Sequence, residues 1–276
     1  THWMNYHRLV RDALARVVGA QPGEVVAMNT LSVNLHLMMV SFYRPTAERP
    51  AILMEAGAFP TDRHAVESQI RFHGFNPETD LIEVQPDEVN GTISMAAIER
   101  AITEHGKRVA LVLWPGVQYR SGQVFDLDAI TQLARAQGAN VGFDLAHSAG
   151  NVPLTLHDTA PDFAVWCHYK YLNSGPGAVA GCFVHERHAR DTTLPRFAGW
   201  WGHEQATRFQ MAPEFVPELG AEGWQLSNPP VLGLAPLRAS LELFDQASME
   251  ALRAKSLQLT GYLETQVRAR LPHVLH

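Results

Sequence analysis

A lysine and an aspartate lie just beyond two short apolar runs in the middle of this chain. Lys170 follows the run Phe163–Cys167, and Asp144 directly follows the run 140–143. A lysine can form a Schiff base with an aldehyde, and a carboxylate can keep a pyridine nitrogen protonated so that the ring withdraws electrons. Alone, these residues would be a surface lysine and a helix-capping aspartate. Paired, with Gly175-Pro176-Gly177 after the lysine, they predict a site for pyridoxal phosphate (PLP).

The elements that must position both residues are short strands that alternate with helices. Strands are predicted at 25–28, 51–55, 81–84, 109–114, 140–143, 163–167 and 178–184. Helices are predicted at 6–18, 94–105 and 127–137, with one or two long helices over 236–271. Two more are predicted to follow the capping residues 29–32, ending at 42, and to follow the segment 57–62, ending at about 73. This alternation is typical of an α/β domain, here with a mainly parallel, seven-stranded-type sheet flanked by helices.

Residues with useful chemistry gather at one end of these strands. Ligands of open α/β sheets bind at the carboxyl ends of the strands. The residues that fall just after a predicted strand are Ser32, Phe59, Pro115, Asp144 and Lys170. Their convergence supports a ligand site independently of the lysine–aspartate pair.

Composition and charge narrow the class of protein. The chain has 276 residues, of which 46% are hydrophobic, so it can bury a substantial core. Its formal net charge of -6, without a basic run, argues against nucleic acid as a partner. Since no apolar stretch approaches the roughly 18 residues of a membrane span, no membrane association is expected.

The cysteines and histidines give no metal signal. Cys167 and Cys182 lie in strand-like runs without metal-ligand spacing, which predicts reduced core thiols and a cytoplasmic protein. His185-Glu186-Arg187-His188 differs from the H-E-x-x-H pattern, so no metal site is expected. The chain begins at Thr1 rather than methionine, and both ends are expected to be cut.

Several motifs together resemble those of the kynureninases, PLP enzymes with the aspartate aminotransferase fold. The matching segments extend over essentially the whole chain and are Met28-Asn29-Thr30-Leu31-Ser32-Val33-Asn34-Leu35-His36-Leu37, Phe59-Pro60-Thr61-Asp62, Pro115-Gly116-Val117-Gln118-Tyr119, Gly142-Phe143-Asp144-Leu145-Ala146-His147, His168-Tyr169-Lys170-Tyr171-Leu172-Asn173, Trp200-Trp201-Gly202-His203-Glu204 and Leu226-Ser227-Asn228-Pro229-Pro230. The resemblance implies a PLP fold type I large domain at 1–235. It implies that 236–276 are connecting helices that lead into a mostly missing C-terminal small domain.

The resemblance also implies an activity and a site. The activity is hydrolysis of L-kynurenine or 3-hydroxykynurenine to an anthranilate and L-alanine, in tryptophan catabolism and NAD biosynthesis. The implied catalytic residues are Lys170, Asp144 and Tyr169. The implied cofactor-binding residues are Leu31, Ser32, Phe59, Asp62, Pro115, Asp144, His147, Tyr169, Lys170, Trp200 and Asn228.

The implied roles follow the parts of the cofactor. Ser32 begins a helix, where free N–H groups favour the phosphate. Phe59 stacks on the ring, and Asp62 is a second carboxylate near it. Tyr169 binds the phosphate and donates a proton. Trp200 and Asn228 reach the site from the neighbouring subunit of a homodimer.

Two alternatives remain open at this point. One is another class V PLP enzyme, such as a cysteine desulfurase or an aminotransferase, although neither cysteine lies on a mobile loop. The other is a PLP-binding fragment without turnover. In the family, the arginine that holds the substrate carboxylate lies in the C-terminal small domain. We assign that role to neither Arg268 nor Arg270, which lie on a predicted helix. The sequence does not indicate whether the preferred kynurenine is hydroxylated.

Overall fold

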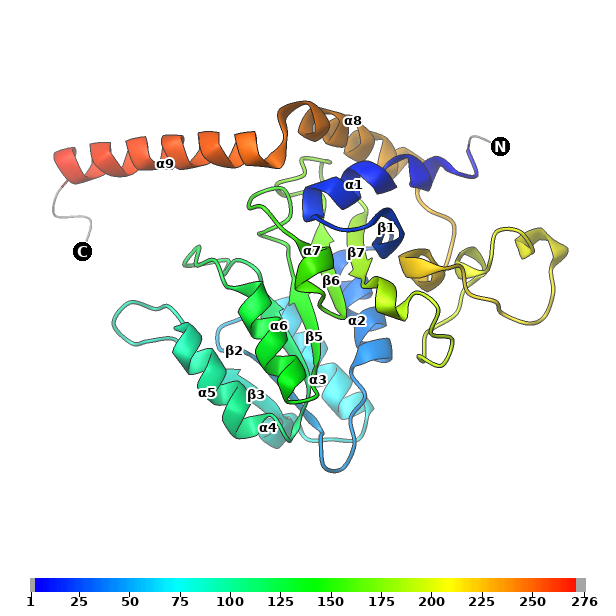
Figure 1. The fold of residues 1–276 in the computed structure, drawn as a ribbon, viewed down its shortest axis with the longest axis horizontal. Coiled ribbons are helices and arrows are strands. Elements are labelled where there is room, and N and C mark those ends of the chain that lie inside the picture. The colour runs from blue at the N-terminus through cyan, green and yellow to red at the C-terminus, as the bar shows by residue number, and fades with distance from the viewer. Residues whose placement is uncertain (1–2, 272–276) are drawn as a thin grey trace.

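The computed structural model describes residues 3–271, and one seven-stranded sheet forms its centre (Figure 1). The strands are β1 (Val25–Ala27), β2 (Ala51–Glu55), β3 (Leu81–Val84), β4 (Val109–Pro115), β5 (Asn140–Asp144), β6 (Phe163–Cys167) and β7 (Ala180–Val184). Their order across the sheet is β1-β7-β6-β5-β4-β2-β3. Neighbours from β6 to β3 are parallel, whereas β7 runs antiparallel to both β1 and β6. The predicted α/β fold with a mainly parallel sheet is therefore confirmed.

Helices cover both faces of this sheet. The α-helices are α1 (Arg11–Val18), α2 (Leu31–Phe42), α3 (Pro60–Phe72), α4 (Pro77–Asp80), α5 (Met95–His105), α6 (Leu127–Ala136), α7 (Leu156–Thr159), α8 (Val231–Ala247) and α9 (Met249–Arg270). The 3-10 turns are η1 (Tyr6–Leu9), η2 (Pro22–Glu24), η3 (Glu186–His188), η4 (Trp200–Gly202), η5 (Arg208–Gln210) and η6 (Gly220–Trp224).

The largest departures from the predicted boundaries concern the first helix and α8. The segment predicted as one helix from 6 to 18 is divided into η1 and α1. The helix predicted to start at Pro236 starts instead at Val231, so Pro236 lies inside α8. A proline there removes a single backbone hydrogen bond. The apolar face of α8 offsets this loss, because Leu234, Leu237 and Leu241 are buried in the core cluster on the side where α8 packs against α1 and η1.

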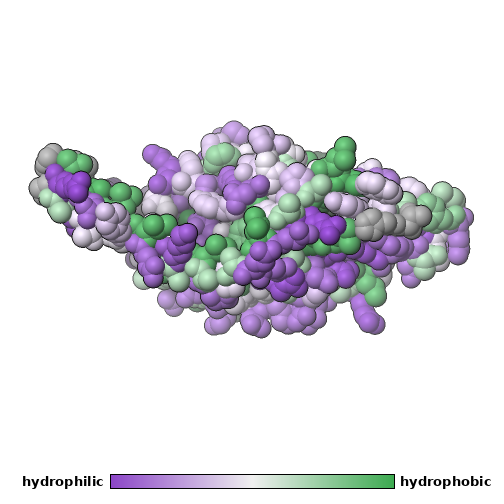
Figure 2. Space-filling view, turned by 90° about the horizontal axis from the view of Figure 1, so that it is seen from above, coloured by the Kyte–Doolittle hydropathy of each residue, from purple (hydrophilic) through white to green (hydrophobic). Residues whose placement is uncertain are grey.

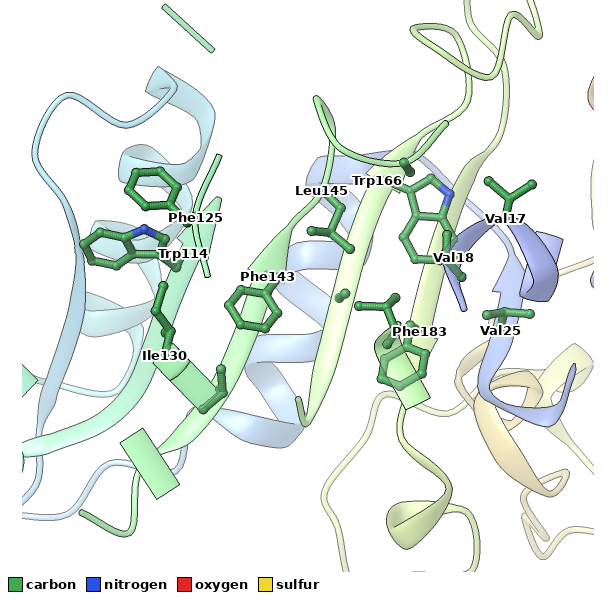
Figure 3. Close-up of a cluster of buried hydrophobic side chains, with 14 of the residues drawn as sticks. Val17, Val18, Val25, Trp114, Phe125, Ile130, Phe143, Leu145, Trp166 and Phe183 are labelled. Atoms are coloured by element: carbon green, nitrogen blue, oxygen red, sulfur yellow. The ribbon is translucent and has the colours of Figure 1, made fainter. Parts of the chain in front are cut away.

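Alternate residues of the strands belong to two hydrophobic cores, one on each face of the sheet. On β6, Ala164 and Trp166 face the core under α1, α5, α6 and α8, while Phe163 and Val165 face the core under α2 and α3. Figure 3 shows the first of these cores, in which Trp166 lies near Phe183 and Val18. Burial on both faces explains why the strands are continuous apolar runs. It also makes the sheet a rigid base for the loops at its edge.

The helix α9 projects from the body as an arm (Figure 1). Its exposed apolar side chains include Leu257, Leu259, Tyr262 and Leu263, and Figure 2 shows hydrophobic and hydrophilic residues mixed over this arm. The division into a large domain at 1–235 and connecting helices at 236–276 stays a prediction, and residues 272–276 lie outside the described residues. Within 3–271, none of the helices combines the length and apolar character that crossing a bilayer demands.

Candidate active site

A cavity of about 350 Å³ lies beyond the carboxyl ends of β2, β4, β5 and β6. This volume is at the lower end of the range usual for small-ligand pockets, about 300–1,000 Å³. The residues that line it are Leu31, Ser32, Glu55, Phe59, Thr61, Asp62, Pro115, Val117, Tyr119, Asp144, Ala146, His147, Tyr169 and Lys170. The fold thus brings the predicted lysine and aspartate into one cavity.

Lys170 is held between a histidine and an aromatic ring. Its Nζ lies 2.9 Å from Nε2 of His147 and 5.7 Å from the centroid of the Phe59 ring. Burial, and then the charge of Lys170, lowers the pKa of His147. A neutral imidazole can accept a hydrogen bond from the ammonium group, so His147 orients the lysine without competing for its charge.

Asp144, the last residue of β5, has a buried carboxyl group whose pKa is raised by burial, while its hydrogen bonds from Ala146 and Asp62 oppose that rise. Its Oδ1 accepts a hydrogen bond of 2.7 Å from the N–H of Ala146, and its carboxyl group is hydrogen-bonded to that of Asp62. Burial and the neighbouring Asp144 raise the pKa of Asp62 to about 9. At neutral pH Asp62 therefore keeps its proton and donates it toward Asp144, which fixes the orientation of the Asp144 carboxylate.

Glu55 was not predicted as a site residue. It is the last residue of β2, and only 2% of it is exposed. Its Oε1 accepts a long hydrogen bond of 3.5 Å from Nε2 of Gln118, and burial raises its pKa to about 7. Among the described residues, neither Oε2 of Glu55 nor Oδ1 of Asp62 has a hydrogen-bond partner. The available signal was a carboxylate that ends an apolar parallel strand.

Four other lining residues were also outside the predicted set. Thr61 and Tyr119 belong to motif segments that matched the family, although neither was given a role. Val117 and Ala146 contribute apolar surface at loop positions, and their residue types carry no chemical signal. Tyr119 forms an edge-to-face contact with Phe59 at 5.4 Å, so the two rings make one aromatic wall.

The N-terminus of α2 provides a place for an anion. Leu31 is the first residue of the helix and Ser32 the second, and Thr30 before them is extended, without a side-chain hydrogen bond to the helix. The first N–H groups of a helix have no partner within it, and the helix dipole favours negative charge there. Both predicted residues line the cavity, so this anion-binding end opens into it.

Tyr169 directly precedes the lysine and lines the same cavity, and about half of its surface is exposed. Burial of the rest, together with the neighbouring Cys167 thiol, raises the pKa of Tyr169. The hydroxyl group therefore keeps its proton at neutral pH and can act as a donor.

Two predicted residues lie outside the cavity of their own chain. Trp200, in η4, packs edge-to-face against Phe209 and donates its indole N–H to the backbone oxygen of Arg208 at 3.3 Å. Asn228 is exposed in the loop that precedes α8. The predicted lining residues from Leu31 to Lys170 are brought together, whereas a role for Trp200 and Asn228 in a neighbouring subunit stays a prediction.

Comparison with known proteins assigns this arrangement to a family. Residues 10–275 match the family described as Aminotransferase class-V. The chain belongs to this family. Over 275 residues it is 81% identical to the kynureninase of Stenotrophomonas maltophilia (strain K279a), a match that covers 100% of this chain and 65% of that protein. The chain therefore spans about two thirds of the length of this curated relative.

Solved class-V-like structures share the fold at low sequence identity. A C-DES variant with glycine covalently linked to its PLP cofactor matches with a TM-score of 0.81 and 18% identity, over 99% of this chain and 68% of that one. The apo cysteine desulfurase of Thermococcus onnurineus NA1 matches with a TM-score of 0.77 and 17% identity, over 96% of this chain and 62% of that one. These structural similarities support the fold, but a shared fold does not show which reaction the chain catalyses.

Proposed function

We propose that the protein containing this chain hydrolyses L-kynurenine, or 3-hydroxykynurenine, to an anthranilate and L-alanine. The observation that carries the proposal is the 81% identity to a curated kynureninase over the full chain. Pyridoxal phosphate is the cofactor, as the class-V family and the PLP-bearing structural neighbour indicate. The protein is proposed to act in the cytoplasm, which its two buried, unpaired cysteines support.

The residues of the cavity fit this cofactor part by part. The N-terminus of α2 with Ser32 suits the phosphate, and Phe59 offers a face for the ring. Asp144 is a buried carboxyl group that suits a protonated ring nitrogen, because the ring's positive charge would favour its ionised form, and Lys170 is the amine for the aldehyde. The unpartnered oxygen of Asp62 shows that this wall has hydrogen-bonding capacity left for a ligand.

The side chains of the chain can then move protons at defined atoms. When bound, PLP supplies an electron sink that stabilises negative charge on the substrate carbon. Nζ of Lys170 takes up and returns the substrate proton, and His147 holds it by the 2.9 Å contact. Asp144 keeps the ring nitrogen protonated, and Tyr169 carries a hydroxyl proton to the product side. This division of roles agrees with cleavage of a carbon–carbon bond next to a carbonyl group.

A cysteine desulfurase is the second candidate, because a desulfurase shares the fold. A desulfurase-type nucleophile must be an accessible thiolate. Cys167 and Cys182 are both buried, and burial raises the pKa of both thiols. These two cysteines are therefore unsuited to receive sulfur from a substrate, which favours the kynureninase proposal.

The test compares two substrates on protein extended to the length of the relatives. With PLP present, we expect anthranilate fluorescence from kynurenine and no sulfide from cysteine, and we expect Lys170→Ala to abolish the fluorescence. Sulfide release without anthranilate would instead assign the desulfurase reaction. If PLP binds but neither substrate reacts, both proposed reactions are refuted and the protein binds the cofactor without turning over either substrate.

We also infer that the protein is a homodimer with shared sites. Trp200 and Asn228 match family motifs but lie outside the cavity of their own chain, which is understandable if each serves its neighbour. A Lys170→Ala chain mixed with an Asn228→Ala chain should then regain part of the activity, because one site of each mixed dimer is intact. Absence of recovery in folded mutants that exchange subunits would refute the shared site.

A further inference from the structure

Three carboxyl groups from three elements line the same cavity. Glu55 ends β2, Asp62 lies in the first turn of α3, and Asp144 ends β5. Among the lining residues within 3–271, the basic side chains are Lys170 and His147, and the lowered pKa of His147 favours its neutral form. Like charges in a water-poor site disfavour one another, so the three carboxyl groups cannot all be ionised near neutral pH.

The hydrogen bonds of the three groups are unequal. Asp144 accepts from the N–H of Ala146 and is bonded to the carboxyl group of Asp62. Glu55 has only the 3.5 Å contact with Gln118 on one oxygen, and its other oxygen has no partner among the described residues. A negative charge on Glu55 is therefore weakly compensated by hydrogen bonds, and its field extends to the neighbouring carboxyl groups.

The groups that face Glu55 come from every surrounding element. Asp62 faces it from α3 and Asp144 from β5. Gln118, beyond β4, bonds both to Glu55 and to the backbone oxygen of Gly57. Lys170, which follows β6, lines the same cavity. The groups that interact with Glu55 are thus two acids and an amide, and the cavity adds one cation.

We propose that Glu55 is a positioning residue whose negative charge adds to burial and to Asp144 in keeping the proton on Asp62, so that Asp62 donates to Asp144 and Asp144 alone meets the cation in the cavity. The inference rests on the proposed cofactor site, since that cation is the protonated ring nitrogen. Glu55 lines the cavity, but its assigned action is on Asp62 and not on the reacting atoms.

The acidities support a working window for this arrangement. Burial raises the pKa of Glu55 to about 7 and that of Asp62 to about 9, and the charge of Glu55 contributes to the latter. Between these values Glu55 is ionised while Asp62 still holds its proton. Without the charge on Glu55, the pH range in which Asp62 holds its proton would end at a lower pH, and above that limit two adjacent carboxylates would face the ring nitrogen.

The deciding measurement follows the carboxyl proton of Asp62 in cofactor-free protein. Infrared spectra with ¹³C-labelled aspartate, recorded from pH 5 to pH 10 on the full-length protein, should contain a protonated-carboxyl band that Asp62→Asn removes. In Glu55→Gln we expect the proton affinity behind this band to fall about tenfold, as for strongly interacting sites. The matched control is Glu83→Gln, because Glu83 lies on β3 and pairs with Arg63 at the surface. An unchanged titration in Glu55→Gln would overturn the proposal.

Wild-type protein provides a second measurement that needs no substitution at Glu55. With ¹³C-labelled glutamate and aspartate, the Glu55 signal should titrate near pH 7, and the Asp62 signal should shift in the same step. A step in Glu55 without any response of Asp62 would also overturn the proposal. Both measurements use cofactor-free protein, so they test the role of Glu55 separately from the reaction. A failure to turn over kynurenine would contradict only the proposed function.

Discussion

At the scale of single residues, Lys170 is placed by the loop that returns the chain from β6 to β7. The N–H of Ser174 donates to the backbone oxygen of His168 at 3.0 Å, which closes the loop around the lysine. Gly175 and Gly177 both have positive φ angles, 82° and 72°, which glycine adopts without strain. The Gly175-Pro176-Gly177 motif therefore shapes the turn that follows Lys170.

The first prediction concerns the lysine–aspartate pair. Borohydride treatment of the PLP-loaded protein should attach the cofactor to Lys170, which a peptide map would show. Asp144→Asn should keep the attachment but lower kcat by roughly 100- to 1,000-fold, the usual loss when a preorganised electrostatic partner is removed. Attachment to a different lysine, or near-normal turnover by Asp144→Asn, would contradict the assigned roles.

The second prediction concerns stability and pH. The pKa of Asp62 is raised from 3.8 to about 9 in the folded chain, so between these values the folded state binds a proton that the unfolded state has lost. Stability therefore falls as pH rises through this window, by about 1.4 kcal/mol per pH unit for one proton. Asp62→Asn removes this slope, and its amide can still donate to Asp144.

The measurement is urea unfolding of cofactor-free protein at pH 6 to 9. The Asp62→Asn variant should lose less stability than the wild type as pH rises, and parallel curves would contradict the raised pKa.

In the acid range, the dependence of stability on pH has the opposite sign. Burial lowers the pKa of His168 from 6.5 to about 3, so stability falls as pH drops below about 6.5 and the unfolded chain gains the proton.

At the scale of elements, β5 must pass close to β6 in order to place Asp144. Gly142 lies two residues before Asp144, and a Cβ atom there would come 2.1 Å from the ring of Phe163. Phe163 is fully buried and stacks against Phe42 at 5.5 Å, so it cannot move aside freely. The absence of a side chain at Gly142 is therefore a packing requirement of the strand that holds the aspartate.

The third prediction follows from this contact. Gly142→Ala should lower the free energy of unfolding by about 1–3 kcal/mol, the usual cost of overpacking a core, and should weaken PLP binding through a displaced Asp144. Gly261→Ala is the control, because nothing lies within 4 Å of its added Cβ on the exposed α9. It should stabilise the chain slightly, since alanine favours a helix by about 1 kcal/mol over glycine. Equal effects of the two substitutions would rule out the steric argument.

The sequence predicted the elements better than their arrangement. Apolar runs located every strand within a few residues, because burial on both faces leaves a strong signal. A strand that is buried on both faces has the same apolar pattern in either direction, so the sequence did not reveal that β7 runs antiparallel to its neighbours. Glu55 was missed because one carboxylate at a strand end becomes informative only beside Asp62 and Asp144, which lie far along the chain. The predicted roles of Trp200 and Asn228 in a neighbouring subunit are not tested by the structure of a single chain.

At the scale of the whole molecule, the cavity is better equipped for cofactor than for substrate. Its lining residues within 3–271 include Lys170 but no arginine to pair with an amino-acid carboxylate. The chain covers 65% of the length of its kynureninase relative. The arm formed by α9 also leaves Leu257, Leu259 and Leu263 exposed, a pattern that suits a helix covered by another part of the protein.

The last prediction is that residues 1–276 alone bind PLP far better than they turn over kynurenine. A bidentate guanidinium–carboxylate contact contributes about 1.5–3 kcal/mol, or roughly 10- to 100-fold in kcat/KM, and the loss of substrate positioning can cost ~100-fold more. The groups that suit the cofactor, Ser32, Asp144 and Lys170, all line the cavity of this chain.

The measurement compares this chain with one extended to the length of its relatives, using absorbance for PLP binding and fluorescence for anthranilate release. The two should bind PLP with similar affinity, and only the longer chain should release anthranilate at a high rate. Equal rates would show that the carboxylate partner lies within residues 1–276, and weak PLP binding by the shorter chain would show that the cofactor site itself depends on the additional sequence.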